Sequence, residues 1–466
     1  MESKTTTIQS ELEAYLKKEG ITINQFAGVS GVNSGTLSSI INGNRPIAMK
    51  QLDRITAGMG LPEGEFYELY IDECVVHSTP DWRRLGPFLQ RCAELDKLEC
   101  IRQVVQTLMD NISYAQALFE TAEEFFVQGK RQAAAMLYEG VAESEKYQHS
   151  ERLALCQYRL FTIALGKDQD ANLRTAMHFE YFVERLDEVD QLNALKDLAN
   201  IYASLHRWNR VEALAEEMGH KASIQYQNKY HKVSRRTVQK EPARPLCFYI
   251  LYAHLLRAAV CDERGDYIQA LHYVSLYSDF SWVQETTEEA RQIMEQFKEW
   301  AEANTYLYRL MTGETKVLAD YVEFINGREN EMVPGLTKIM QAANRLDFNV
   351  DEIIERFEPH LGLKNLKTRM GKLNAQVTED KYTVLLYELA VYCLNAQKIK
   401  NGIAYLFQCL ETSVRMNSDS HIVQCVVLFE QYRHLSSGED QERYKILIGE
   451  VQKINDKKSG SAAGSR

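Results

Sequence analysis

The chain has 466 residues, of which 45% are hydrophobic, and its formal net charge is -11. This length and this apolar fraction are sufficient for a buried core and for more than one domain. The acidic excess excludes a protein that coats nucleic acid non-specifically, because such binding needs dense Lys and Arg, but it permits a small DNA-reading domain on an acidic body.

The composition also predicts an all-α fold, since the chain has only 8 prolines and 24 glycines and is rich in residues that favour helices. Its 9 cysteines are scattered without the spacing of a metal site, so we expect reduced thiols, no metal and no cofactor. The N-terminus lacks the apolar core of a signal peptide, and the longest apolar run, at 245–256, is too short to span a bilayer. These features predict a cytoplasmic protein without membrane association.

Four helices are predicted in residues 1–70. The first begins near Ile8 and ends at Gly20, and the second begins at Ile23 behind a capping box of Thr22 and Gln25. A third short helix follows an N-cap at Asn33 or Ser34 and stops at the sequence NGN, 42–44. The fourth has an apolar face in 49–59. Short helix, tight turn and short helix within a small bundle is the helix-turn-helix arrangement.

The helix-turn-helix segment is free of carboxylates. No Asp or Glu occurs from Thr22 to Leu52, whereas Arg45 and Lys50 are present and hydroxyl and amide side chains crowd 33–44. Phosphate oxygens accept hydrogen bonds from such groups and from helix N-terminal amides, and a carboxylate there would repel the duplex. We therefore expect this segment to contact double-stranded DNA, the alternative being a helical bundle that only retains the pattern.

Residues 21–62 resemble the XRE (Cro/C1-type repressor) helix-turn-helix domain over nearly all of that domain. The resemblance rests on the glutamine near the start of the second helix, on Ala27 and Val32 at the turn, on Leu37 and Ile40, and on the Arg-Pro pair after NGN. The recognition helix departs from stronger members because it has no Arg, Gln or Lys for bidentate base recognition, so we expect modest affinity per domain. The resemblance implies base-edge contacts from Asn33, Ser34, Gly35, Thr36 and Ser39 and backbone contacts from Gln25, Asn44, Arg45 and Lys50.

The rest of the chain is predicted to form a helical junction at 71–110, a helical array at 111–455 and a flexible tail at 456–466. Four stretches in the array follow the order of a tetratricopeptide repeat (TPR), with small residues, an aromatic residue, a turn and a second helix. A weaker fifth stretch lies at 306–322. Such repeats predict a right-handed α-solenoid of degenerate TPR-like helix pairs, because each pair needs neighbours to bury its apolar face. The four stretches are 119–145, 198–218, 260–277 and 387–411.

The lining of such a solenoid comes mainly from the first helix of each pair. Amide side chains there can pair with the backbone of an extended peptide, and a lysine can pair with a carboxylate. The alternative for each residue is a solvated polar face without a ligand. The predicted peptide-binding residues are Asn193, Lys196, Asn200, Ser204, Tyr252, Tyr392 and Asn395.

Residues 221–245 are predicted as a locally basic insertion between units. They could serve as a DNA-backbone arm, as an anion-binding lip or simply as a solvated loop. The sequence pattern leaves these three interpretations open.

An XRE-type domain followed by a TPR-like array resembles the peptide-pheromone receptors of Gram-positive bacteria and their phages, the RRNPP family. This family includes the PlcR-, NprR- and Rgg-like regulators, and the arbitrium receptors are their relatives. The resemblance implies a cytosolic homodimer that binds a promoter and whose array binds a short signalling peptide. Part of the dimer surface is expected near 381–455. Two alternatives remain, a DNA-bound adaptor whose groove holds a protein partner and a Rap-like regulator of response-regulator phosphorylation. The sequence contains no nucleophile–base pair or phosphate loop, so no enzymatic activity is expected.

Overall fold

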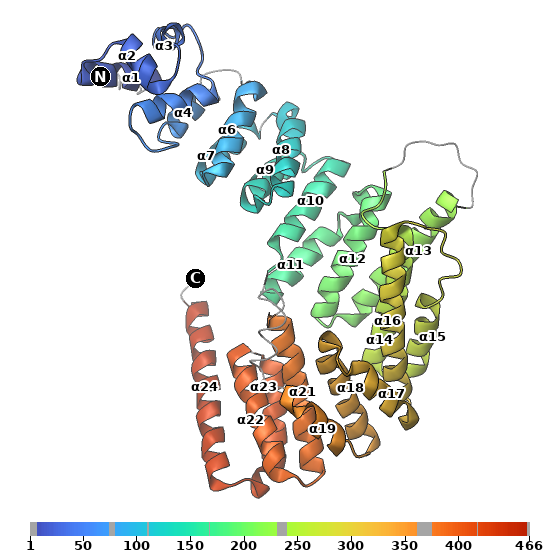
Figure 1. The fold of residues 1–466 in the computed structure, drawn as a ribbon. Helices are drawn as coiled ribbons and strands as arrows, with labels where there is room; N and C mark the ends of the chain where they lie inside the picture. Colours follow the sequence, from blue (N-terminus) through green and yellow to red (C-terminus); the bar gives the residue numbers. More distant parts are fainter. Residues whose placement is uncertain are drawn as a thin grey trace. The chain divides into compact units, whose positions relative to one another are not determined.

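The structure, a computed structural model, describes residues 7–73, 80–109, 111–166, 168–230, 240–360, 375–416 and 418–463. Within these ranges the backbone forms helices and no strand (Figure 1), so the predicted all-α fold is confirmed. None of the helices described is long and apolar enough to cross a membrane. Contacts divide the chain into two compact units, 1–244 and 245–466, and this boundary falls inside the stretch that the sequence predicts as one array domain.

The first unit is a series of helices that pack on one another largely in chain order. Its last helix continues through Tyr230, so the first part of the predicted basic insertion is helical, whereas 231–239 lie outside the described residues. The helices are α1 (Ile8–Glu19), α2 (Ile23–Ser30), α3 (Ser34–Ile41), α4 (Met49–Gly58), α5 (Tyr67–Ile71), α6 (Trp82–Glu94), α7 (Leu98–Leu108), η2 (Ile112–Tyr114), α8 (Ala115–Val127), α9 (Arg131–Ser144), α10 (Glu151–Ala164), α11 (Gln169–Glu180), η3 (Val183–Arg185), α12 (Glu188–Ser204) and α13 (Trp208–Tyr230).

The second unit continues the same pattern of neighbouring helices. Its last helix reaches Ala463 and so includes most of the stretch predicted as a flexible tail, because a helix, once formed, extends at little further cost. The helices are α14 (Leu246–Arg264), α15 (Tyr267–Tyr277), α16 (Glu288–Met311), η4 (Thr315–Val317), α17 (Leu318–Ile325), α18 (Glu329–Leu346), α19 (Asp351–Phe357), η5 (Glu358–His360), α21 (Ala375–Asn395), α22 (Ile399–Met416), α23 (Asp419–Tyr432), η6 (Arg433–Leu435) and α24 (Gly438–Ala463).

The repeat-like stretches of the sequence fold as helix pairs. The pairs α8/α9, α12/α13, α14/α15 and α21/α22 coincide with the four predicted stretches, and the two helices of each pair pack on each other. Each pair turns through one residue in the left-handed region, with φ of +78° at Gly129, +54° at His206, +72° at Gly265 and +60° at Gln397. Glycine adopts this conformation without strain, which explains why it occupies two of the four turns.

The N-terminal helices share one hydrophobic core with the helix pairs that follow them. The core runs without a break from Ile8 in α1 to Cys156 in α10. The Tyr67 and Phe88 rings meet edge to face with centroids 5.3 Å apart, and the Tyr70 hydroxyl donates to the Ile47 carbonyl over 2.8 Å. Packing therefore joins the predicted DNA-binding segment to α6 and α7, in the stretch predicted as a junction.

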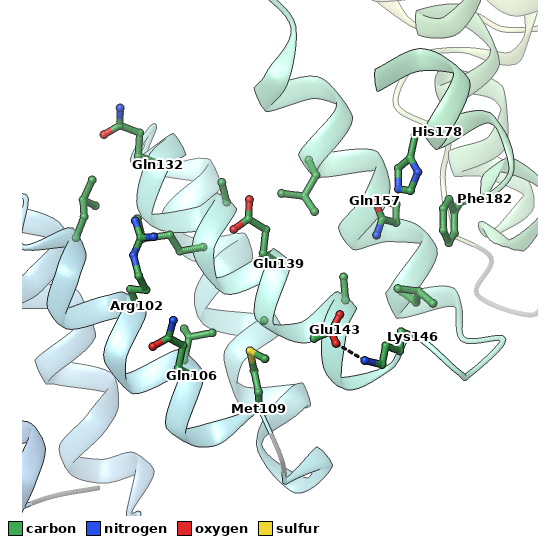
Figure 2. Close-up of a pocket in the computed structure, with 18 of the residues that line it drawn as sticks. Arg102, Gln106, Met109, Gln132, Glu139, Glu143, Lys146, Gln157, His178 and Phe182 are labelled. Atoms are coloured by element: carbon green, nitrogen blue, oxygen red, sulfur yellow. Dashed lines mark hydrogen bonds and ion pairs between the residues drawn. The ribbon is translucent and has the colours of Figure 1, made fainter. Parts of the chain in front are cut away.

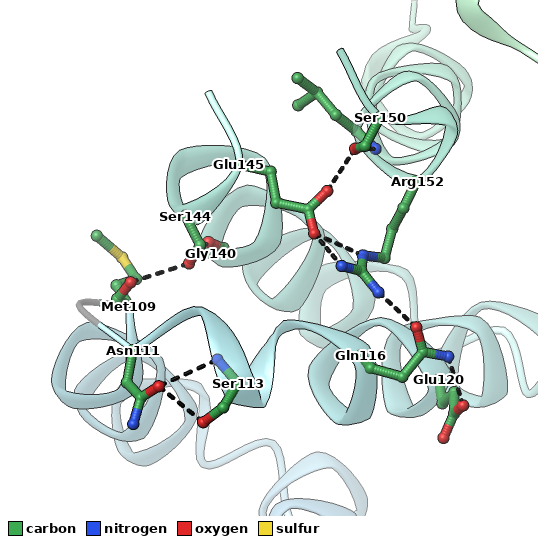
Figure 3. Close-up of polar contacts among 11 residues, drawn as sticks. Met109, Asn111, Ser113, Gln116, Glu120, Gly140, Ser144, Glu145, Ser150 and Arg152 are labelled. Atoms are coloured by element: carbon green, nitrogen blue, oxygen red, sulfur yellow. Dashed lines mark hydrogen bonds and ion pairs between the residues drawn. The ribbon is translucent and has the colours of Figure 1, made fainter. Parts of the chain in front are cut away.

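A buried ion pair closes the corner between α9 and α10 (Figure 3). The Glu145 side chain is fully buried, and its carboxylate accepts from Arg152 Nε over 2.7 Å and from the Ser150 hydroxyl. Arg152 also donates to Gln116 of α8. Because Ser150 is the N-cap of α10, these contacts set where that helix begins relative to α8 and α9.

Candidate nucleic-acid interface and array pocket

Side-chain caps fix the two helices of the helix-turn-helix. The Thr22 hydroxyl accepts from the Gln25 backbone N–H over 3.3 Å, and Gln25 Oε1 accepts from the Thr22 backbone N–H over 2.8 Å, as the sequence predicts. Asn33 is the N-cap of α3, because its Oδ1 accepts from the Gly35 N–H over 2.9 Å. These caps occupy the carbonyl oxygens of Gln25 and Asn33, so their amide N–H2 groups are the parts available to a phosphate.

The core orients α3 so that its polar side faces outward. Phe26, Leu37 and Ile40 are fully buried beneath it. A Cβ at Gly58 of α4 would lie only 2.8 Å from the Ser30 Cβ, so glycine permits α4 to approach α2 closely. This contact holds α4 against α2.

The nine predicted DNA-binding residues all belong to the surface formed by α2, α3 and the segment that follows them. None of the nine is buried, and their contact with DNA stays a prediction. Gln25, Asn33, Gly35, Asn44, Arg45 and Lys50 are exposed, and Ser34, Thr36 and Ser39 are half-buried.

Charges around this surface are arranged so that carboxylates turn away from it. Asp53, the first acidic residue after the acid-free stretch, accepts from the Tyr67 hydroxyl over 2.9 Å and from Arg91 over 3.1 Å. Burial and this carboxylate raise the pKa of the Tyr67 hydroxyl well above its ordinary value. Arg54 donates to the Gly31 carbonyl over 3.2 Å and adds a cation that the sequence interpretation missed. The surface of α2 and α3 therefore has no acidic side chain, and its cations, Arg45, Lys50 and Arg54, lie in the segment that follows α3.

Two of the predicted peptide-binding residues belong to a closed hydrogen-bond network. Asn193 Nδ2 donates to the Tyr158 hydroxyl over 2.6 Å, and that hydroxyl donates to Asp197 over 2.6 Å. Lys196 donates to Asn193 Oδ1 over 2.8 Å and lies 3.0 Å from Asp197. The polar groups of α10 and α12 thus satisfy one another, and peptide binding by Asn193 and Lys196 stays a prediction.

The same side of the array carries a second internal cluster. Arg159 of α10 contacts both carboxylate oxygens of Glu123 in α8 at 2.9 Å, and the Tyr138 hydroxyl donates to that carboxylate. Burial alone would raise the pKa of Glu123, but these hydrogen bonds lower it below its ordinary value. We call this side, with the two clusters on α8, α10 and α12, the first-helix face.

The remaining predicted peptide-binding residues do not form one site. Asn200 and Ser204 are exposed on α12, in the first unit, and the other three belong to the second unit. Tyr252 stacks on Phe248, and the buried Tyr392 hydroxyl donates to Asp351 over 2.9 Å. Asn395 is exposed and accepts from Tyr432 over 2.9 Å. Their role in ligand binding stays a prediction.

A pocket of about 1190 Å³ opens between α7, α9, α10, α11 and η3 (Figure 2). We call it the array pocket. Arg102 and Gln106 of α7 lie on one side of it in Figure 2, and Gln157, His178 and Phe182 lie on the other. Its lining includes none of the seven predicted peptide-binding residues. The sequence offered no signal for this pocket, because its lining comes from helices far apart in the chain.

No protein-family model and no curated protein matches the chain. Among solved structures, the chain is similar to the "Crystal Structure of Bacillus thuringiensis PlcR in complex with the peptide PapR7 and DNA". The sequence identity is 13%, the TM-score is 0.23, and the match covers 74% of this chain and 96% of that chain. At this identity and TM-score, the similarity does not show that this chain binds a peptide or DNA.

Proposed function

We propose that the chain is a non-enzymatic, sequence-specific DNA-binding regulator of transcription. In this proposal it acts as a homodimer in the cytoplasm, and a short signalling peptide bound by its helical array alters its affinity for DNA. The observation that carries the proposal is the acid-free polar surface of α2 and α3, beside which Asp53 is turned inward and paired. Exposed amides and cations on such a surface can donate hydrogen bonds to the phosphate oxygens of a DNA backbone.

Arg45 and Lys50 are proposed to contact phosphates, because both are exposed and no ion pair joins either of them to a carboxylate among the described residues. Replacing each with alanine should weaken binding to all duplexes alike and lower the salt dependence of log K by about 0.9 per contact. The measurement is fluorescence anisotropy at several salt concentrations, on a duplex recovered by genomic footprinting of the tagged protein. Lys17→Ala on the exposed side of α1 is the matched control. Slopes that equal the wild-type slope would remove both residues from the interface.

A homodimer is proposed because two linked domains can bind two half-sites and so compensate for modest affinity per domain. The second unit carries an apolar surface suited to this role. Val423 and Val427 are exposed at 61% and 62% and lie four residues apart on α23, and Ile446 of α24 is exposed at 59%. Exposed apolar side chains on one helix face are typical of protein–protein contacts.

Replacing Val423 and Val427 together with glutamate should convert a dimer into a monomer, because two carboxylates would be buried without partners. Sedimentation velocity of the full chain provides the measurement. The matched control replaces Gln292 and Gln296, exposed residues four apart on α16, with glutamate and should leave the mass unchanged. A double-valine variant that sediments like the control would place the dimer contact elsewhere.

A further inference from the structure

The two sides of the first array helices differ in how their polar groups are satisfied. On the first-helix face, Glu123, Arg159 and Asn193 are all hydrogen-bonded within the protein. In the array pocket, the side chains of Gln106, Gln132, Gln157 and Glu139 have no hydrogen bond or ion pair to any described residue. Polar groups that converge on a concave site without internal partners are available to a ligand.

These two sides are separated by the body of α10. Leu153, Gln157 and Leu160 line the array pocket at positions i, i+4 and i+7. With a rotation of about 100° per residue, these three positions share one side of the helix, and Tyr158 and Arg159 fall on the opposite side. A ligand in the array pocket would therefore not contact the clusters of the first-helix face.

We infer that the array pocket is the peptide site and that it binds a short, extended, chemically unmodified peptide. This inference rests on the proposed function and gives its ligand a place and a chemistry. Gln106, Gln132 and Gln157 come from α7, α9 and α10, and each amide can both donate to and accept from a peptide backbone. The volume of about 1190 Å³ exceeds that of ordinary small-molecule sites, about 300–1000 Å³, and accommodates several residues.

Charges in the array pocket suit the two ends of such a peptide. Lys146 and Glu143 pair with each other (Figure 2). Arg102 pairs with Glu99 over 3.2 Å. Glu139 and Arg185 make no ion pair with any described residue, and the Arg185 guanidinium lies 5.2 Å from the centre of the Phe182 ring. Glu139 therefore receives the terminal ammonium group, and Arg185 receives the terminal carboxylate.

A ligand in the array pocket would contact helices that pack against different parts of the first unit. One wall is α7, which shares its core with the DNA-binding segment, and another is α11, which packs on α12 of the next pair. A peptide that contacts both walls favours one separation of these helices over others. This is the physical route by which the ligand biases the DNA-binding segment.

The test uses the immobilised full chain and a pool of randomised, unmodified heptapeptides. A retained peptide is sequenced and resynthesised in four forms, with free ends, with an acetylated N-terminus, with an amidated C-terminus and with both ends capped. Each cap should weaken binding to the wild type about tenfold. Acetylation should have no effect on Glu139→Gln, and amidation should have no effect on Arg185→Gln, because each variant already lacks the partner of that end.

Glu151→Gln on α10 and Arg174→Gln on α11 change the same charges at exposed positions outside the pocket and should respond to both caps as the wild type does. The inference is overturned if capping weakens Glu139→Gln and Arg185→Gln as much as the wild type, or if no peptide is retained. The proposed function is tested separately, by the effect of the free peptide on DNA affinity. A peptide that obeys the capping pattern but leaves DNA affinity unchanged would refute the regulatory role and not the site.

Discussion

Replacing Ser34 and Thr36 together with glutamate is expected to lower the affinity for DNA by about a hundredfold or more. Both residues lie in the first turn of α3, where the surface contains no other acidic side chain. Two carboxylates at this position would replace hydrogen-bond donors with charges that repel phosphates, and each altered contact is worth about tenfold. A gel shift or anisotropy titration on the duplex recovered by footprinting gives the affinity.

Local structure should survive this change. Asn33 remains as the N-cap of α3. Negative charge in the first turn stabilises a helix, because it interacts favourably with the helix dipole. Circular dichroism should therefore be unchanged, which separates loss of contact from loss of fold. Gln292→Glu with Gln296→Glu, at exposed positions of α16, adds the same charge outside the interface and should bind like the wild type. If the α3 variant still binds, another surface of the molecule contacts the DNA.

Replacing Arg152 with alanine is expected to destabilise the first unit by about 3–5 kcal/mol, because a fully buried carboxylate would lose its charged partner. Figure 3 shows that Glu145 would keep only the Ser150 hydroxyl among the contacts drawn. A urea titration of the full chain followed by circular dichroism measures the free energy of unfolding.

Adding Glu145→Gln to Arg152→Ala should recover most of that loss, since a neutral amide is less costly to bury than an unpaired charge. Lys146→Ala is the matched control one position along the chain, because its ion pair with Glu143 is solvent-exposed and contributes little to stability. Equal effects of Arg152→Ala and Lys146→Ala would mean that the corner of α9 and α10 is held by packing alone.

The local features of the DNA-binding segment could be predicted because they depend on residues close in sequence. The capping box of Thr22 and Gln25 joins residues three apart, and the Asn33 cap joins residues two apart. The helix pairs were predictable for the same reason, since apolar spacing and a turn residue such as Gly129 act within one repeat.

The candidate ligand site could not be predicted, because it depends on which faces of distant helices meet. The spacing of Asn193 predicts a groove residue, but its amide donates a hydrogen bond to Tyr158, 35 residues earlier. Gln106 and Gln157 look like ordinary exposed glutamines until packing brings α7, α9 and α10 around one cavity.

The sequence by itself determined the helical class, the helix-turn-helix with its caps and the pairing of neighbouring helices, since these follow from hydrogen bonds and apolar periodicity within a few turns. Only the tertiary structure decided that Asp53 pairs with Arg91, 38 residues away, and that the open polar groups lie in the array pocket rather than on the first-helix face. The reason is that the hydrogen-bond partners of a polar side chain are its neighbours in space. These neighbours cannot be identified from a single sequence.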